Sequence, residues 1–196
     1  LGEDYHGIMV YRLSDMAQTA FIKLPKYELP MEIHWVSDTR LVYVKGGKWG
    51  AREQPYDFGE IIAMDFDGKD HTYIFGYKES TLSMGLDPGH GNFEGLPRKP
   101  NGKFYMTRSS AESAIGRSLL YEVDASTGRH HLAANVGGDQ NLDFVMDAAG
   151  VARFAYGADK NERQLLYIAD AQGENWHKVP DDVVGGVFSP LGFTPD

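Results

Sequence analysis

The fold of this chain is decided by the stretch Gly59-Glu60-Ile61-Ile62-Ala63-Met64-Asp65-Phe66-Asp67-Gly68, because the pattern recurs. A strand-like run ends in an acidic residue, and a tight turn that contains glycine follows. Two further copies are Leu119-Leu120-Tyr121-Glu122-Val123-Asp124-Ala125-Ser126-Thr127-Gly128 and Leu165-Leu166-Tyr167-Ile168-Ala169-Asp170-Ala171-Gln172-Gly173. A weaker copy, Met9-Val10-Tyr11-Arg12-Leu13-Ser14, has serine in place of the acid.

The spacing of these copies is that of a β-propeller blade. The residues that end the four copies are Ser14, Asp65, Asp124 and Asp170, and successive ones are 51, 59 and 46 residues apart. Such intervals fit one four-stranded blade with its loops. The sequence therefore predicts an all-β fold: a β-propeller segment of about three complete four-stranded blades, with partial blades at both ends.

A second turn-and-strand element, out of phase with the first, fixes the expected strands. It occurs at Asp38-Thr39-Arg40-Leu41, Asn101-Gly102-Lys103-Phe104 and Ala149-Gly150-Val151-Ala152. The complete blades are then expected at 31–36, 41–45, 59–66 and 71–76; at 103–108, 117–124 and 129–133, with a first strand within 83–96; and at 141–146, 151–156, 164–170 and 176–179. Two leading strands, 7–13 and 19–24, and one trailing strand, 183–188, would belong to partial blades. An open arc is favoured over a closed four-bladed ring.

Composition narrows the class of protein. The 196 residues are 42% hydrophobic and 24% charged, as in ordinary globular proteins, and no linker divides them, so residues 1–196 are predicted to form a single domain. A net charge of −9 makes nucleic acid an unfavourable partner. No apolar run is long enough to span a membrane. Cysteine is absent, which excludes disulfides and thiolate chemistry but leaves the compartment open.

The run Trp35-Val36-Ser37-Asp38-Thr39-Arg40-Leu41-Val42-Tyr43-Val44, taken with the stretch 59–68, resembles the N-terminal propeller of bacterial serine peptidases of the prolyl oligopeptidase family. Within that family, the chain is similar to the group of dipeptidyl aminopeptidase and acylaminoacyl-peptidase-like proteins. The resemblance implies a propeller ahead of an α/β-hydrolase domain, and this chain would be about half of that propeller. It further implies a bacterial protein of the periplasm or the cytoplasm, with short peptides and the hydrolase domain as partners.

No catalytic, metal or cofactor residue is predicted within the chain. Ser118 has Gly116 before it but Leu120 after it, so it does not complete a Gly-x-Ser-x-Gly elbow. The adjacent His130 and His131 would point to opposite faces of a strand.

The segment 80–100 is expected to be an inter-blade insertion. Asp87, His90 and Glu94 share a glycine-rich stretch there, which is interpreted as a loop that offers too few ligands for calcium. The run 89–95 misses the spacing of a phosphate-binding loop by one residue.

Structural roles are predicted for the remaining marked residues. The recurring acids Asp65, Asp124 and Asp170 are expected to accept hydrogen bonds from turn amides. The three tryptophans, Trp35, Trp49 and Trp176, are expected to pack between blades.

Two functions remain open at this point. The first is an accessory propeller that restricts and guides peptides to a serine peptidase domain outside this chain. The second is a freestanding interaction propeller that binds a protein or a glycan through its loops. In either case the unpaired edges of an open arc are expected to make the chain self-associate.

Overall fold

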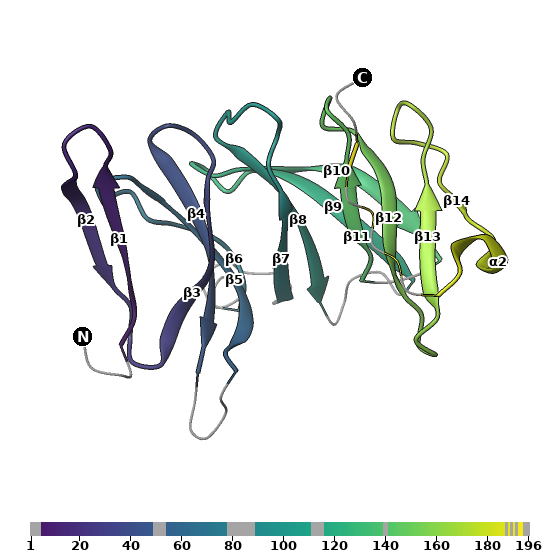
Figure 1. Ribbon diagram of the computed structural model, residues 1–196, viewed down its shortest axis with the longest axis horizontal. Helices are drawn as coiled ribbons and strands as arrows, with labels where there is room; N and C mark the ends of the chain where they lie inside the picture. Colours follow the sequence, from purple (N-terminus) through teal and green to yellow (C-terminus); the bar gives the residue numbers. More distant parts are fainter. Residues whose placement is uncertain are drawn as a thin grey trace.

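The computed structural model describes residues 5–48, 54–77, 89–110, 116–138, 141–186, 188, 190, 192 and 193. Within them, one two-stranded and three four-stranded antiparallel sheets follow one another along the chain. The sheets stand side by side as an open arc, with the first and the fourth at opposite ends (Figure 1). This arrangement confirms the prediction of a β-propeller segment with three complete blades.

The strands of each sheet are consecutive in sequence. The first sheet holds β1 (Gly7–Arg12) and β2 (Ala17–Lys23). The second holds β3 (Glu28–Trp35), β4 (Arg40–Gly47), β5 (Tyr56–Asp65) and β6 (Thr72–Phe75). The third holds β7 (Gly89–Gly95), β8 (Lys103–Ser110), β9 (Arg117–Asp124) and β10 (His130–Gly137). The fourth holds β11 (Asp143–Met146), β12 (Ala152–Ala158), β13 (Gln164–Ile168) and β14 (His177–Lys178).

The core lies between neighbouring sheets. Side chains alternate between the two faces of a strand, so each central strand supplies apolar residues to two interfaces. On β4, Leu41 and Tyr43 pack against the first sheet, whereas Val42 and Val44 pack towards the third. A further apolar cluster, which includes Leu120, Val136 and Phe144, joins the third sheet to the fourth. Burial of these groups is the main stabilisation of the arc.

Hydrogen bonds also join neighbouring sheets. The Arg40 guanidinium, buried at the start of β4, donates through Nε to the carbonyl of Ala125 in the third sheet at 2.9 Å. The Gly102 N–H donates to the carbonyl of Val36 at 2.7 Å. The Tyr105 hydroxyl donates to the carbonyl of Gly150 in the fourth sheet at 3.2 Å. Each of these bonds satisfies a polar group at a packed interface.

The predicted hairpin turns are confirmed. Gly68, Gly128 and Gly173 have φ angles of 78°, 70° and 77°, a conformation that glycine adopts without a steric penalty. The Asp124 carboxylate accepts hydrogen bonds from the N–H groups of Ser126 and Thr127, both at 2.9 Å.

The recurring acids do not all act in the same way. Asp170 accepts from the N–H groups of Gln172 and Glu174 at 3.0 and 2.9 Å, so the expected role holds there as it does at Asp124. The expectation was wrong for Asp65, which accepts from Arg40 at 2.6 Å instead of from its turn. In that turn Asp67 takes the role, accepting from the Lys69 N–H at 3.0 Å.

Two expected elements differ from the structure. The glycine-rich stretch at 89–95, interpreted as a loop, is strand β7, paired with β8, and it is the first strand of the third sheet that was expected within 83–96. The strand expected at 183–188 does not form, because residues 181–184 are helix α2 (Asp181–Val184). Pro180 precedes this helix, two acids occupy its first turn where the helix dipole favours them, and Gly185 ends it with a φ of 73°.

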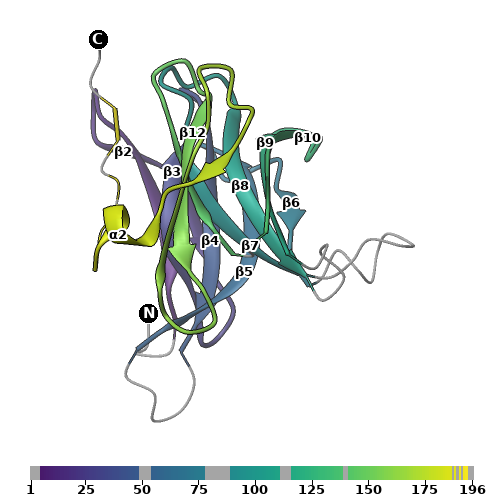
Figure 2. The same cartoon turned by 90° about the vertical axis from the view of Figure 1, so that its right-hand side faces the viewer.

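The C-terminal part of the described chain covers the outer face of the fourth sheet. Helix α2 contacts β13. Figure 2 shows α2 on the side of β12 that faces away from β9 and β10. The Phe193 ring stacks on that of Phe154, with centroids 5.0 Å apart, and Phe188 lies against Tyr156. This end of the arc is therefore partly capped. Across the described residues, no helix has the length and apolarity needed to cross a membrane.

Candidate binding surfaces

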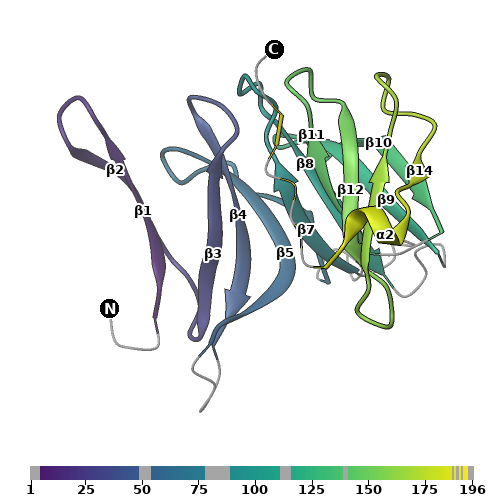
Figure 3. The same cartoon turned by 45° about the vertical axis from the view of Figure 1, so that its right-hand side comes forward.

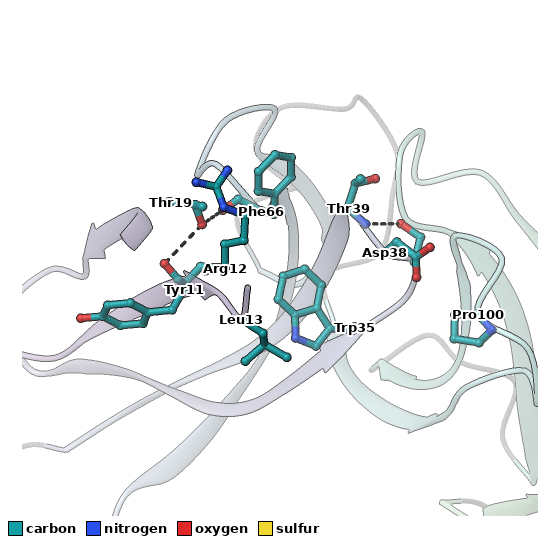
Figure 4. Close-up of a pocket in the computed structure, with 11 residues that line it drawn as sticks. Tyr11, Arg12, Leu13, Thr19, Trp35, Asp38, Thr39, Phe66 and Pro100 are labelled. Atoms are coloured by element: carbon teal, nitrogen blue, oxygen red, sulfur yellow. Dashed lines mark hydrogen bonds between the residues drawn. The ribbon is translucent and has the colours of Figure 1, made fainter. Parts of the chain in front are cut away.

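An apolar cleft, here called the Trp35 cleft, opens where the first two sheets meet (Figure 4). Its volume is about 520 Å³, and the end of β1, the end of β3 and Phe66 after β5 form most of its wall. Trp35 is 43% exposed in this cleft. Trp35 does lie at the junction of the first two sheets, where it was expected to pack, but its ring is only partly covered there. Trp176 does pack as expected, edge-on to Phe144, and Trp49 lies outside the described residues.

Polar groups surround the apolar wall of the Trp35 cleft. The Thr19 hydroxyl donates to the carbonyl of Phe66 at 2.9 Å and holds β2 beside the second sheet. Arg12 pairs with Asp15 at 2.6 Å on the turn above the cleft. Asp38 adds a carboxylate to the lining. An apolar wall with a few polar groups at its rim suits binding of an apolar or aromatic side chain rather than chemistry.

A second surface, here called the acidic inner edge, carries Glu32 on β3, Glu94 on β7 and Asp143 on β11. Each of these strands is the edge strand that begins its sheet. The His34 ring on β3 stacks on Phe93 of β7 with centroids 3.8 Å apart, and β7 in turn contacts β11. The three carboxylates are thereby gathered from three adjacent sheets.

Glu94 is the most perturbed group of the acidic inner edge. Burial raises its pKa to about 7, against the opposing effect of hydrogen bonds from the Phe144 N–H and the Thr107 hydroxyl. Those bonds measure 3.0 and 2.7 Å. The negative charges of Asp143 and Glu32 raise the pKa of Glu94 further, and burial also raises the pKa of Asp143. Burial, with the nearby negative charges as a smaller cause, thus leaves the Glu94 carboxyl group with a pKa near neutral pH.

Ser118 has a structural position. It is buried within β9, and its hydroxyl oxygen accepts a hydrogen bond from the Leu142 N–H of the next sheet at 3.0 Å. A serine nucleophile needs a base within hydrogen-bonding reach and an open approach for substrate. The bond to Leu142 joins two sheets instead.

The paired histidines are also structural. The His131 ring lies 2.8 Å from a carboxylate oxygen of Glu122, while His130 packs edge-on against Tyr121. No group of three metal-binding side chains occurs among the described residues.

The glycine-rich stretch that suggested a cation or phosphate loop is part of a sheet. His90 and Glu94 lie on β7, and Asp87 lies outside the described residues. Gly91 pairs with Arg108 and Gly89 with Ser110, so this backbone belongs to a sheet ladder and does not cradle an anion. The Asp57 carboxylate beside the His90 ring raises the pKa of that histidine. Sequence reasoning missed Glu94 as part of a charged surface because it treated the segment as a loop.

Comparison with known proteins supports the fold alone. No family model matches the chain, and no curated protein matches its sequence. Among solved structures, an oligogalacturonate lyase in complex with manganese superposes with a TM-score of 0.55 over 86% of this chain. Its sequence is 10% identical, and this chain spans 40% of its length. The chain is therefore similar to that lyase in its propeller architecture.

Proposed function

We propose that this chain is the non-catalytic propeller segment of a serine peptidase, which receives short peptides and guides them to a hydrolase domain outside the chain. The acidic inner edge is the observation that carries the proposal. A short peptide presents a free amino group that is positively charged below its pKa of about 8. Glu32 and Asp143 attract that group to the side of the arc on which the sheets begin, where the Glu94 carboxyl group lies between them in the order of sheets.

The raised pKa of Glu94 fits this role. An approaching ammonium group favours the ionised form of Glu94, so peptide binding releases the proton that Glu94 holds near neutral pH. Binding of a free amino terminus is then stronger above pH 7 than at pH 6. An acetylated peptide lacks the charge and gains nothing from the ionisation.

Peptide binding tests the proposal directly. The probe is a tripeptide with a C-terminal fluorophore, with its amino group free or acetylated, titrated with the full chain at pH 7.5. The free form is expected to bind about tenfold more tightly, as expected for one charge-assisted contact of roughly 1.4 kcal/mol. The double variant Glu94→Gln, Asp143→Asn should remove the difference, whereas the double control Glu162→Gln, Asp182→Asn, on exposed residues, should preserve it. Equal binding of the two peptides to the unmodified chain would refute the proposal.

The Trp35 cleft favours the second candidate, an interaction propeller that binds a protein or glycan through its loops. Exposed aromatic rings stack on sugar faces and bury apolar side chains. Under this alternative, Trp35→Ala would abolish partner binding and leave the tripeptide difference intact. The reading frame beyond residue 196 also separates the candidates, since a Gly-x-Ser-x-Gly elbow downstream supports the peptidase assignment.

A further inference from the structure

Strand β7 of the third sheet carries a row of polar side chains along one face. Figure 3 shows β7 and β8 between β5 of the second sheet and β12 of the fourth. His90, Asn92 and Glu94 occupy alternate positions of β7, so their side chains point to the same side. Asn92 is the cross-strand partner of Thr107 on β8, whose hydroxyl group lies on that side too. Thr107 is only 8% exposed, so its hydroxyl group requires partners within the protein.

His90 is held in place at the start of this row. Its Nε2 lies 3.4 Å from a carboxylate oxygen of Asp57 on β5, and Asp57 also accepts a hydrogen bond from the Gly59 N–H at 2.6 Å. The His90 ring lies directly against Gly59, because a Cβ on Gly59 would come within 2.4 Å of Cγ of the ring. The Asp57 carboxylate and a hydrogen bond to Asn92 both raise the pKa of His90, which favours the protonated ring.

The hydrogen bonds that follow from His90 all run in one direction. A protonated imidazole can only donate, so Asn92 presents its amide oxygen to His90. Its Nδ2 is then free to donate to the hydroxyl oxygen of Thr107, at 3.2 Å. A hydroxyl group has one proton, and that of Thr107 is donated to Oε1 of Glu94 at 2.7 Å. Each group therefore orients the next, and the row ends on the Glu94 carboxyl group.

This row of hydrogen bonds leaves part of the Glu94 carboxyl group open. Oε2 accepts from the Phe144 N–H at 3.0 Å, so each carboxyl oxygen has one donor. An ionised carboxyl group has about four acceptor positions, which leaves about two for a ligand. Burial raises the pKa of Glu94, and the hydrogen bond from Thr107 opposes that effect. The Thr107 hydroxyl thus favours the ionised form, which accepts at both oxygens.

We propose that Asn92 and Thr107 are positioning residues for recognition of an amino group: their hydrogen bonds hold Oε1 of Glu94 as an acceptor and leave its remaining acceptor position to the ligand. This assignment rests on the proposed function, in which Glu94 receives the amino terminus of a peptide. Asn92 acts through Thr107, and Thr107 acts through Glu94. Replacement of either residue should therefore shift the pH range in which peptides bind.

The other titratable groups around Glu94 stay unchanged in such variants. Glu32 on β3, which itself contacts His34 at 2.9 Å, and Asp143 on β11 act on Glu94 through their charge. His90 lies on the same strand and keeps its contact with Asp57. A change in the titration of Glu94 would therefore follow from the hydrogen bond that was removed.

Titration of Glu94 tests the assignment without any peptide. Carbon-13 NMR of the glutamate carboxyl carbons gives the midpoint of the titration in the full chain, and Glu94→Gln identifies the signal. Thr107→Val should raise the midpoint by about one pH unit, because a hydrogen bond to a charged group favours the ionised form about tenfold. Thr107→Ser keeps the hydroxyl group and should leave the midpoint unchanged. Asn92→Ala should raise it by a smaller amount, whereas Asn135→Ala, at an exposed position of β10, is the control and should not move it.

Peptide binding connects the hydrogen bonds to recognition. With the free and acetylated tripeptides at pH 7.5, Thr107→Val should reduce the preference for the free amino group about threefold. The reason is that a midpoint of about 8 leaves roughly a quarter of Glu94 ionised at this pH, in place of roughly three quarters. Thr107→Ser should retain the preference. Circular dichroism of each variant checks that the sheets persist.

The inference would be overturned by a Glu94 midpoint that neither Thr107→Val nor Asn92→Ala moves, or by one that Thr107→Ser raises as much as Thr107→Val does. A raised midpoint with an unchanged preference for the free amino group would overturn it as well. Equal binding of the two peptides to the unmodified chain contradicts the proposed function instead. In that case raised midpoints would still assign control of Glu94 to Asn92 and Thr107, so the two failures are distinguishable.

Discussion

Glu94 of the third sheet accepts a hydrogen bond from the backbone N–H of Phe144, a buried residue on β11 of the fourth sheet, at 3.0 Å. The same carboxyl group accepts from Thr107 at 2.7 Å, so one side chain joins β7, β8 and β11. A buried acid in this position makes the contact between two sheets depend on its protonation.

Stability is expected to fall between pH 5 and pH 8 because of Glu94. Its pKa is about 7 in the folded chain and near 4.5 when unfolded, so the folded state binds the proton more tightly. Protonated Glu94 contributes at most about 3 kcal/mol to the free energy of unfolding. This contribution is complete below pH 4.5 and is lost as the pH rises through 7. Urea unfolding at each pH measures it. His90, whose pKa is also raised, contributes in the same direction.

The variant Glu94→Gln isolates the effect of this residue. The amide keeps an acceptor for Phe144 and cannot ionise, so its stability should change less over this interval and should exceed that of the unmodified chain at pH 8. Asp143 and Glu32 face Glu94 and remain in both proteins, so the difference between the two curves belongs to residue 94. Parallel curves would show that the carboxyl group does not titrate as described.

Replacement of Arg40 is expected to destabilise the chain strongly. The guanidinium pairs with Asp65 and donates to the carbonyl of Asp70, the hydroxyl of Thr72 and the carbonyl of Ala125. Arg40→Ala leaves these acceptors without a donor and should lower the free energy of unfolding by about 3 kcal/mol. Arg40→Lys retains the charge but not the forked set of donors, so its free energy of unfolding should lie between those of the unmodified chain and Arg40→Ala. Arg163→Ala, on an exposed turn, should change stability by less than about 0.5 kcal/mol, and equal losses for the two alanine variants would contradict the assignment.

Asp124 is expected to stabilise its hairpin through turn hydrogen bonds. Asp124→Ala removes the acceptor for three donors, the N–H groups of Ser126 and Thr127 and the Thr127 hydroxyl, and should cost about 1–2 kcal/mol in thermal unfolding. Asp124→Asn keeps an acceptor oxygen and should cost less. Ser126→Ala, in the same turn, is the control and should lower stability less than Asp124→Ala does. An equal loss of stability for the two variants would contradict the role given to the Asp124 carboxylate.

Self-association is expected through the outward face of the first sheet. Met9 and Phe21 are cross-strand partners on that face and are 58% and 46% exposed. Apolar pairs of this kind favour contact with another copy. Light scattering at high concentration should give a mass above 21.8 kDa for the unmodified chain and for Leu132→Lys, and 21.8 kDa for Met9→Glu, Phe21→Lys. A mass of 21.8 kDa for the unmodified chain under these conditions would contradict self-association through this face.

The order of strands could be predicted from the sequence because each blade repeats a local pattern. The acid and glycine turns mark hairpins without knowledge of long-range contacts. Strand β7 was harder to recognise, since its glycines reflect close approach of another strand: a Cβ on Gly91 would lie 2.8 Å from the Phe75 ring. The residues of helix α2 were predicted to begin a strand because valine favours strands, and Val183 and Val184 are adjacent. Pro180 and the two acids that follow it are signals of a helix start.

The candidate surfaces were less accessible to sequence reasoning. Glu32, Glu94 and Asp143 are far apart along the chain and become neighbours only when three sheets stand side by side. Their separations of 62 and 49 residues are close to one blade, which is the signal that could have revealed them. The exposure of Trp35 depends on which strands are present beside it, and no local pattern contains that information.

The succession of sheets also determines how the chain would carry a mechanical load. Among the described strands, the main contacts between sheets join neighbouring sheets, so a force applied between the two ends passes through the sheet interfaces in series. The interface of the two-stranded first sheet rests on the apolar residues Ile8, Val10, Ala20 and Leu24, and the Thr19 hydroxyl donates a hydrogen bond across it to the carbonyl of Phe66. Under tension this hairpin would peel away first, while the Arg40 and Glu94 contacts would keep the three complete sheets together.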